Sequence, residues 1–385
     1  MPGFSSMDDL INETTTNGKS LRVDWNKNFL PTTAAVAGEW FHLARGNGNP
    51  PPDSLYNTGT NLTFQPVSDT TTNSTGIRHG GNVSPDYKHL MAASAFSAAA
   101  TTMPSVAMLI DLIGFYRVTT TTTITSQALT NTLSAFSTFT ADAGTDICTH
   151  SNINLFTYTR CQLTTTTTLP AGLSLATDYY VIKVTDTTIK FATSYANAVA
   201  GTAVDITDAG TGTHTINTLY PRYTSGAGVQ AMMWANNATP LGAATPNLSL
   251  PSYTNSAQST GRATPTVLPI GKTAAANGLV LYSGTGVGKY GPAMPLQAGD
   301  AGIAKVDNVQ ISVSYVSGEF SVGLFVPLAI LPMTTIGVAS ERDFLSQIPS
   351  LPRIYDGANL SVLLYNGANT PTNSAFFGHL QFGWG

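Results

Sequence analysis

The chain has 385 residues, a formal net charge of −4 and 42% hydrophobic residues, but only 10% of its residues are charged, against roughly 25% in an ordinary soluble domain. This length predicts two or three domains with a sizeable core, and the apolar content excludes disorder for most of the chain. The absence of a Lys/Arg run argues against nucleic-acid binding, and the sequence has neither a secretory signal pattern nor an apolar run of ~20 residues for a membrane span.

Such low charge suits a chain that functions inside an assembly, because a free monomer normally uses charged residues to stay soluble. A secreted, Thr-rich β protein would have a similar composition. Composition alone leaves both classes open.

The first third of the chain predicts two helices and one long strand. Ser6 is a typical N-cap residue, and Asp9 three positions later completes a capping pattern. Residues 45–60 are a loop rich in Gly, Pro and Asn. A Ser-Pro pair predicts that a helix covers residues 84–100. The apolar run 105–118 predicts a strand that is buried on both faces.

The composition changes after this strand, which predicts an inserted domain. Thr runs at 119–123 and 164–168 bound a polar stretch, and β-branched and aromatic residues between turn residues predict short strands. We therefore expect an outer β-rich assembly domain, residues 1–130 plus 219–385, and an inserted β module, residues 131–218, that projects from it. A surface loop tolerates an insertion where its two ends lie close together.

The two cysteines, Cys148 and Cys161, lie inside the module in segments that predict paired strands. A disulfide is possible if they lie opposite each other. The alternative that we favour is two small buried hydrophobic side chains. With His150 nearby they are still too few ligands for a metal site, and the sequence predicts no metal and no cofactor.

The C-terminal part predicts a series of strands and one helix. Apolar residues alternate at 311–315 and 320–326 around a turn at 317–319, which predicts a β-hairpin. Residues 340–347 predict a short capped helix, and residues 360–364 predict another strand. The last strand carries four apolar residues on one face, expected in the core or in contact with a neighbouring subunit: Phe376, Leu380, Phe382 and Trp384.

Several short segments of the sequence resemble segments of known proteins. In the module, "LPAGLSLATDYYVI", "TIKFATSYANAVAGTAVDIT" and "AGTGTHTI" resemble a β module that recurs in head, tail and fibre proteins of tailed bacteriophages. Outside it, "RHGGNVSPDYKHLM", "GKYGPAMPLQAGD" and "ERDFLSQIPSLPRIYDGANL" resemble a group of phage virion proteins that usually lack the module.

The resemblance implies a non-enzymatic structural protein of the virion. We expect a capsid cement or decoration protein on the outer capsid surface, a homo-oligomer with a trimer favoured, which binds the major capsid protein and stabilises it. A tail, baseplate or fibre component is the alternative, and the major coat protein ranks third because the chain predicts no long spine helix. The predicted fold is mainly β, with a β-sandwich or jelly-roll-like outer domain, a few short helices and the small inserted β domain. The module could bind a host-surface glycan.

An enzymatic role finds little support in the sequence, which predicts no catalytic residues. Residues 284–289 are rich in Gly but lack the P-loop pattern. A tail depolymerase would need paired carboxylates across a groove; Asp300 or Asp307 could contribute, but nothing selects them. Glu341 and Asp343 are expected to be charges at a helix N-terminus.

Overall fold

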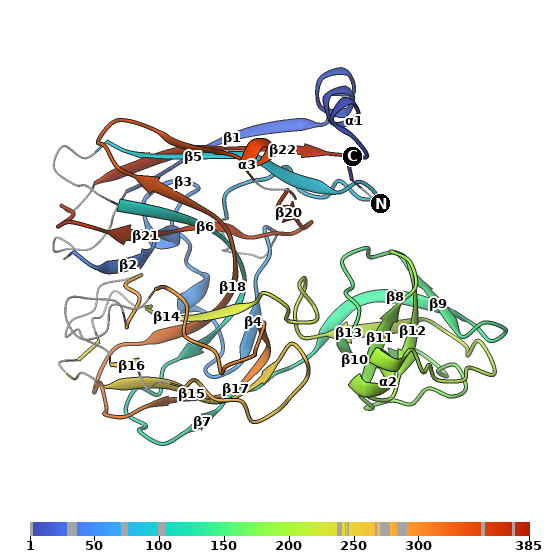
Figure 1. Cartoon of the computed structure of the whole chain (residues 1–385). Coiled ribbons are helices and arrows are strands. Elements are labelled where there is room, and N and C mark those ends of the chain that lie inside the picture. The colour runs from blue at the N-terminus through green and yellow to red at the C-terminus, as the bar shows by residue number, and fades with distance from the viewer. Residues whose placement is uncertain are drawn as a thin grey trace.

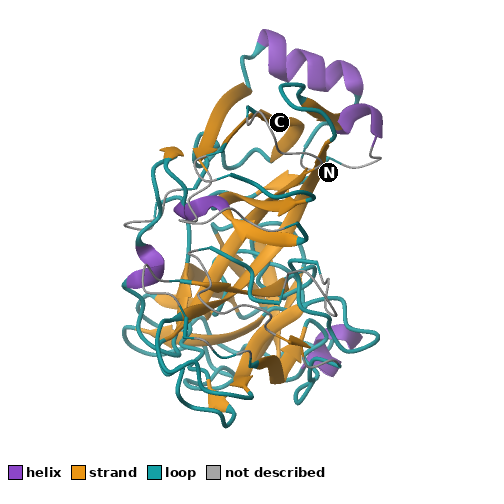
Figure 2. Ribbon diagram, turned by 90° about the vertical axis from the view of Figure 1, so that its left-hand side faces the viewer, coloured by secondary structure: helices purple, strands orange, loops and turns teal. Residues whose placement is uncertain are grey.

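The computed structural model describes residues 3–28, 37–70, 76–98, 105–236, 241–242, 244, 246–265, 268–269, 278–282, 291–347, 351–371 and 374–385. The Gly-rich segment 284–289 therefore lies outside the described residues. The chain is 45% strand and 7% helix, which confirms the mainly β prediction. Figure 2 shows that the few helices lie at the periphery of the strands.

The first sheet joins strands from both ends of the chain. Its order is β19-β5-β22-β1-β3, and β20 also pairs with β5. The strands are β1 Ser20–Asn28, β3 Gly48–Asn49, β5 Lys88–Ser97, β19 Ser340–Asp343, β20 Arg353–Ile354 and β22 Ala375–Trp384. The two chain termini lie close together at one end of this sheet (Figure 1).

Two further antiparallel sheets lie below it in Figure 1. The second has the order β14-β18-β6-β21-β2, with β4 also paired to β6, and the third has the order β16-β15-β17-β7. The strands of the second are β2 Glu39–His42, β4 Phe64–Pro66, β6 Ser105–Val118, β14 Gln230–Ala235, β18 Phe320–Met333 and β21 Leu360–Asn366. Those of the third are β7 Gln127–Ala128, β15 Asn247–Asn255, β16 Leu268–Pro269 and β17 Ile303–Ile311.

A closed six-stranded barrel stands beside the three sheets (Figure 1). Its order is β10-β11-β12-β9-β8-β13. The elements are β8 Ser134–Asp142, β9 Ile147–His150, β10 Arg160–Thr165, β11 Tyr179–Lys183, β12 Thr188–Ala192, the helix α2 Tyr195–Ala200 and β13 His214–Thr218. Closure leaves this small module no unpaired sheet edge.

The remaining helical segments are short: α1 Met7–Ile11, the π-helical turn Asn12–Thr16, the 3₁₀ turns Leu43–Arg45 and Leu55–Asn57, and α3 Phe344–Gln347. The predicted N-cap is confirmed, since the Ser6 hydroxyl accepts a hydrogen bond from the Asp9 backbone N–H at 3.0 Å. In a capping box the Asp9 carboxylate would accept a hydrogen bond from the Ser6 backbone N–H. Here it accepts from the Ser5 backbone N–H at 2.8 Å.

The helix predicted over residues 84–100 is wrong, because residues 88–97 form strand β5. This strand pairs with β22 on one side and with β19 and β20 on the other. Ala93 and Ala95 are fully buried in it. Local alanine content favours a helix, but hydrogen bonding and burial on both sides override that preference.

The predicted hairpin and the last predicted helix are also wrong in part. Strands β17 and β18 lie in different sheets, because β18 pairs along its length with β6 and not with its neighbour in sequence. The first half of the predicted helix 340–347 is strand β19, paired with β5, and only α3 is helical. The buried strand at 105–118 and the strand beginning at residue 360 are confirmed as β6 and β21.

The three sheets share one hydrophobic core, and the barrel has its own. The shared core draws on all three sheets, for example on Trp25, Leu109 and Ile311. The barrel core contains Phe139, Val181, Phe191 and Ile216 among others. Two separate clusters indicate that the barrel and the outer sheets can gain and lose their packing separately.

The shared core also holds a neutral histidine. His42 is buried, and its ring Nε2 lies 2.9 Å from the Ser361 hydroxyl. Burial, with the nearby positive charges of Lys27 and Arg45, lowers the pKa of His42 to about 3. The folded chain therefore keeps this ring uncharged at a pH where the unfolded chain protonates it.

We expect this difference to make the fold less stable in acid. Below pH 6.5 the unfolded chain binds a proton that the folded chain does not, so the free energy of unfolding should fall as the pH is lowered toward 3. Between pH 6.5 and 5 we expect wild type to lose about 2 kcal/mol more than the His42→Leu variant. Urea unfolding at both pH values measures this difference, and equal losses in both proteins would contradict the assignment.

Candidate functional site: the assembly surface and the barrel junction

The C-terminal strand lies in the core of its own chain. Phe376, Leu380 and Phe382 are almost completely buried, while Trp384 is half-buried with the Lys88 ammonium 6.0 Å from its ring centre. Strand β22 is hydrogen-bonded to β1 and β5 on its two sides. It therefore has no open edge with which to extend the sheet of a neighbouring subunit.

The two cysteines are free and buried in the barrel core. Cys148 lies on β9 and Cys161 on β10, which are not neighbours in the barrel, so the expectation of paired strands is wrong. Burial raises the pKa of the Cys148 thiol to about 12 and raises that of Cys161 as well. Both side chains fit the hydrophobic interpretation that the sequence favoured.

A loop of the barrel fastens it to the outer sheets. The Phe156 ring packs against the rings of Tyr223 and Tyr355, at centroid distances of 6.3 and 5.7 Å, and these two rings lie 4.7 Å from each other. The Phe156 backbone N–H donates to the Thr224 hydroxyl at 3.0 Å, and Arg353 donates to the Asn154 side-chain oxygen at 3.0 Å. The barrel is thus docked at a defined place on the outer sheets.

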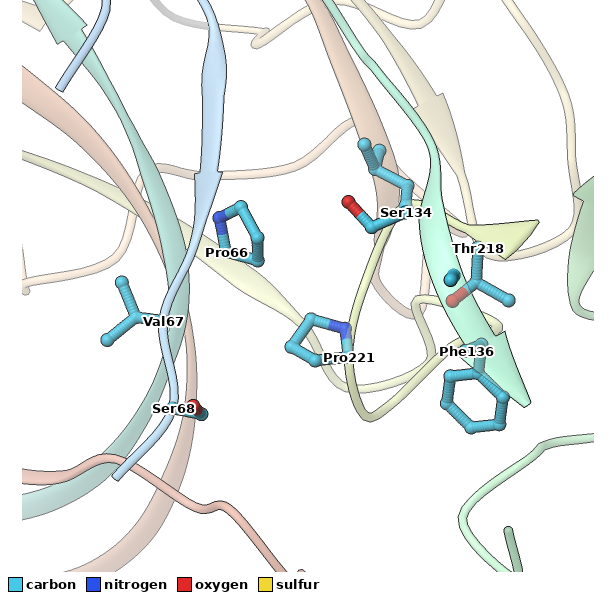
Figure 3. Close-up of a pocket in the computed structure, with 9 residues that line it drawn as sticks. Pro66, Val67, Ser68, Ser134, Phe136, Thr218 and Pro221 are labelled. Carbon is cyan, nitrogen blue, oxygen red and sulfur yellow. The ribbon is translucent and has the colours of Figure 1, made fainter. Parts of the chain in front are cut away.

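A cavity of about 220 Å³ lies next to this junction. Figure 3 shows its lining: Pro66, Val67 and Ser68 on one side, and Ser134, Phe136, Thr218 and Pro221 on the other, with Leu219 and Ala135 completing the wall. None of these lining residues has an ionisable side chain, and the polar ones are Ser68, Ser134 and Thr218.

The chain returns from the barrel into a buried ion pair. Arg222 donates from Nε to Asp111 Oδ2 at 2.7 Å and from Nη2 to Oδ1, and both side chains are 1% exposed. Arg222 Nη1 also donates to the Val67 carbonyl at 2.7 Å, and the Asn359 backbone N–H donates to Asp111 at 3.0 Å. The pair fixes the return segment onto β6, beside the cavity of Figure 3.

A groove of about 400 Å³ opens at the end of the first sheet. Its walls come from α1 and the following turn, from β5 and β22, and from the β19–α3 segment: Met7, Leu10, Ile11, Thr14, Thr15, Ser20, Met91, Ala92, Glu341, Asp343, Leu345, Gln381 and Phe382. We call it the α1 groove. Met7 is 55% exposed, Ile11 51% and Leu345 40%, which is unusual for side chains of this size gathered in one place.

The charges that line the α1 groove are negative. Glu341 and Asp343 are both exposed on strand β19, where alternation places them on the same side. The expectation that they mark a helix N-terminus is wrong for Glu341, which lies within the strand. It holds for Asp343, which directly precedes α3 and accepts a hydrogen bond from the Leu345 backbone N–H at 2.8 Å. No Lys or Arg stands among the lining residues, so the α1 groove suits a partner segment that is apolar and positively charged.

The candidate depolymerase carboxylates are held in hydrogen-bond networks. Asp300 accepts from Tyr253, Asn255 and Arg262; burial alone would raise the pKa of Asp300, but these hydrogen bonds outweigh it and lower it. Asp307 is paired with Lys305 at 2.7 Å. A general acid for glycoside cleavage needs a raised pKa, and Asp300 has the opposite shift.

Within the described part of the chain, no three His, Cys, Asp or Glu residues gather as metal ligands. Among the same residues, no helix is long and apolar enough to cross a membrane.

Comparisons with known proteins assign no family. No protein-family model matches the chain, and no curated protein matches it significantly. A solved structure of T=1 particles derived from infectious bursal virus aligns with 97% of this chain and 82% of that chain, at 9% identity and a TM-score of 0.16. A likeness at this level carries no argument.

Sequence reasoning did not find the α1 groove or the partner of Asp111. The polar Asp111 inside an apolar strand was the available signal, since a buried carboxylate requires a partner. The groove had no such signal, because it is assembled from four separate segments.

Proposed function

We propose that the protein is a structural protein of a tailed-phage particle, a cement or decoration protein that binds coat subunits through the α1 groove. The resemblance of several short sequence segments to those of phage virion proteins supports a structural role in the particle. The observation that carries the proposal is the groove itself, in which exposed apolar side chains stand beside two carboxylates. We place an apolar, basic segment of the major capsid protein in it.

The low charge of the chain fits this role. Outside the two carboxylates of the α1 groove, a contact with few ions avoids the desolvation cost of burying them, and multiple weak contacts around a symmetry axis add to each other. We propose a homo-oligomer, with a trimer favoured, on the outer capsid surface. A tail, baseplate or fibre component is the second candidate, since the sequence segments of the inserted module resemble segments of those proteins too.

Substitution in the α1 groove tests the proposal. Ile11→Lys removes an apolar contact and adds a positive charge that repels a basic partner segment, so we expect at least tenfold weaker binding to capsids that lack the protein. Leu175→Lys is the matched control, because Leu175 is 58% exposed on the barrel. Binding is measured by co-sedimentation of purified protein with these capsids.

Higher salt should also weaken wild-type binding, because exposed charge pairs are screened. Equal binding of wild type and Ile11→Lys would overturn the role of the groove. Binding to isolated tails but not to capsids would favour the second candidate.

A further inference from the structure

Three tyrosine rings gather on the outside of the barrel. Tyr158 precedes β10, Tyr180 lies on β11, and Tyr195 is the first residue of α2. The ring of Tyr195 lies 5.5 Å from that of Tyr158 and 6.3 Å from that of Tyr180, both edge to face. All three side chains are half-buried, and none belongs to the barrel core. Tyr180 points outward because its neighbours Tyr179 and Val181 are in that core.

A fixed polar group lies beside the rings. Arg160 is the direct strand partner of Tyr180, and its Nε donates to the Asp178 carboxylate at 2.8 Å. Gln162, the next outward residue of β10, donates to the other oxygen of Asp178 at 2.9 Å. The Arg160 and Asp178 side chains are 29% and 37% exposed. The pair neutralises its own charge and still presents donors and acceptors to solvent.

The backbone at Tyr158 is strained. Its φ is +65°, a conformation that costs a non-glycine residue about 1–2 kcal/mol. Hydrogen bonds hold it there, from the Tyr158 N–H to the Val181 carbonyl at 2.7 Å and from the Val181 N–H to the Thr159 carbonyl at 3.0 Å. This backbone conformation leaves the Tyr158 ring half-buried at the surface and outside the barrel core. Strain that serves no core packing is typical of a binding site.

These side chains form what we call the tyrosine face: Tyr158, Arg160, Gln162, Asp178, Tyr180 and Tyr195. We propose that the tyrosine face binds a neutral saccharide. The C–H face of a sugar ring packs against aromatic rings, and its hydroxyls need donors and acceptors at fixed positions, which Arg160, Gln162 and Asp178 supply. The face carries one positive and one negative charge that pair with each other, so it has no net positive charge to attract a phosphate or an acidic sugar. This activity does not depend on where in the particle the protein sits.

A glycan array printed with neutral bacterial surface polysaccharides tests this site with the full-length chain. Wild type binds at least one polysaccharide, Tyr195→Ala lowers the affinity at least tenfold, and Tyr195→Phe keeps it within threefold because the ring remains. Tyr365→Phe, on strand β21 of the outer sheets, is the control and binds like wild type.

Far-UV circular dichroism of each full-length variant checks that the variant is folded like wild type. Absence of binding by wild type, or equal binding by a folded Tyr195→Ala, overturns the proposal. Capture of bacterial surface proteins with no response to polysaccharide overturns it in favour of a protein ligand.

Discussion

Replacing Arg222 by Met should destabilise the outer sheets by about 3–5 kcal/mol, because it leaves the Asp111 carboxylate buried without its partner. The Arg222 guanidinium also donates a hydrogen bond to the Val67 carbonyl. In the variant this buried carbonyl has no donor, which adds to the loss of stability. All four tryptophans, Trp25, Trp40, Trp234 and Trp384, lie outside the barrel. Tryptophan fluorescence during urea unfolding therefore reports on the outer sheets alone.

Two variants show whether the loss comes from the unpaired charge. Arg22→Met removes an arginine from an exposed pair with Asp24, whose side chains are 62% and 76% exposed, and should change the urea midpoint within error. The double variant Asp111→Leu/Arg222→Met removes both charges and should regain at least half of the loss. A single variant as stable as wild type would contradict the importance of this pair.

Replacing Phe191 by Ala should unfold the barrel and spare the outer sheets. Phe191 is fully buried, with the rings of Phe139 and Tyr179 at 5.5 and 5.9 Å. Truncating such a ring costs about 3–5 kcal/mol, a large fraction of what a small module has. We expect circular dichroism to show a separate transition at much lower urea, which belongs to the barrel if tryptophan fluorescence does not report it.

The tryptophan transition of the same variant should stay where it is in wild type. Val199→Ala, at a side chain that is 55% exposed on α2, serves as the control and should move neither transition. Capsid binding should also persist in the Phe191→Ala variant, since the α1 groove lies in the outer sheets. If both transitions moved together, the two cores would behave as one cooperative unit.

The sequence predicted strands well where burial left a long or alternating apolar pattern. Strand β6 is such a case, since a run of fourteen residues is buried along most of its length. Prediction failed at β5, because its alanines have no strand pattern and only the pairing partners from the distant C-terminus make it a strand. The hairpin failed for the same reason, since β18 prefers a partner two hundred positions earlier, as in the pair Phe320 and Val118.

The candidate sites depend even more on distant contacts. The α1 groove combines residues from positions 7 to 382, and no local sequence pattern predicts that these distant segments lie together. The tyrosine face depends on both local and distant contacts, because Tyr180 lies on a strand next to Tyr179, whose burial turns Tyr180 outward. Only the closed barrel brings Tyr158 and Tyr195 to its side.

A cryo-EM map of the intact particle tests the proposed function most directly. We expect density for this chain on the outer capsid surface between coat subunits, with the α1 groove against the coat and the barrel exposed. Density for the chain confined to the tail, or found in the coat lattice itself, would contradict a decoration role.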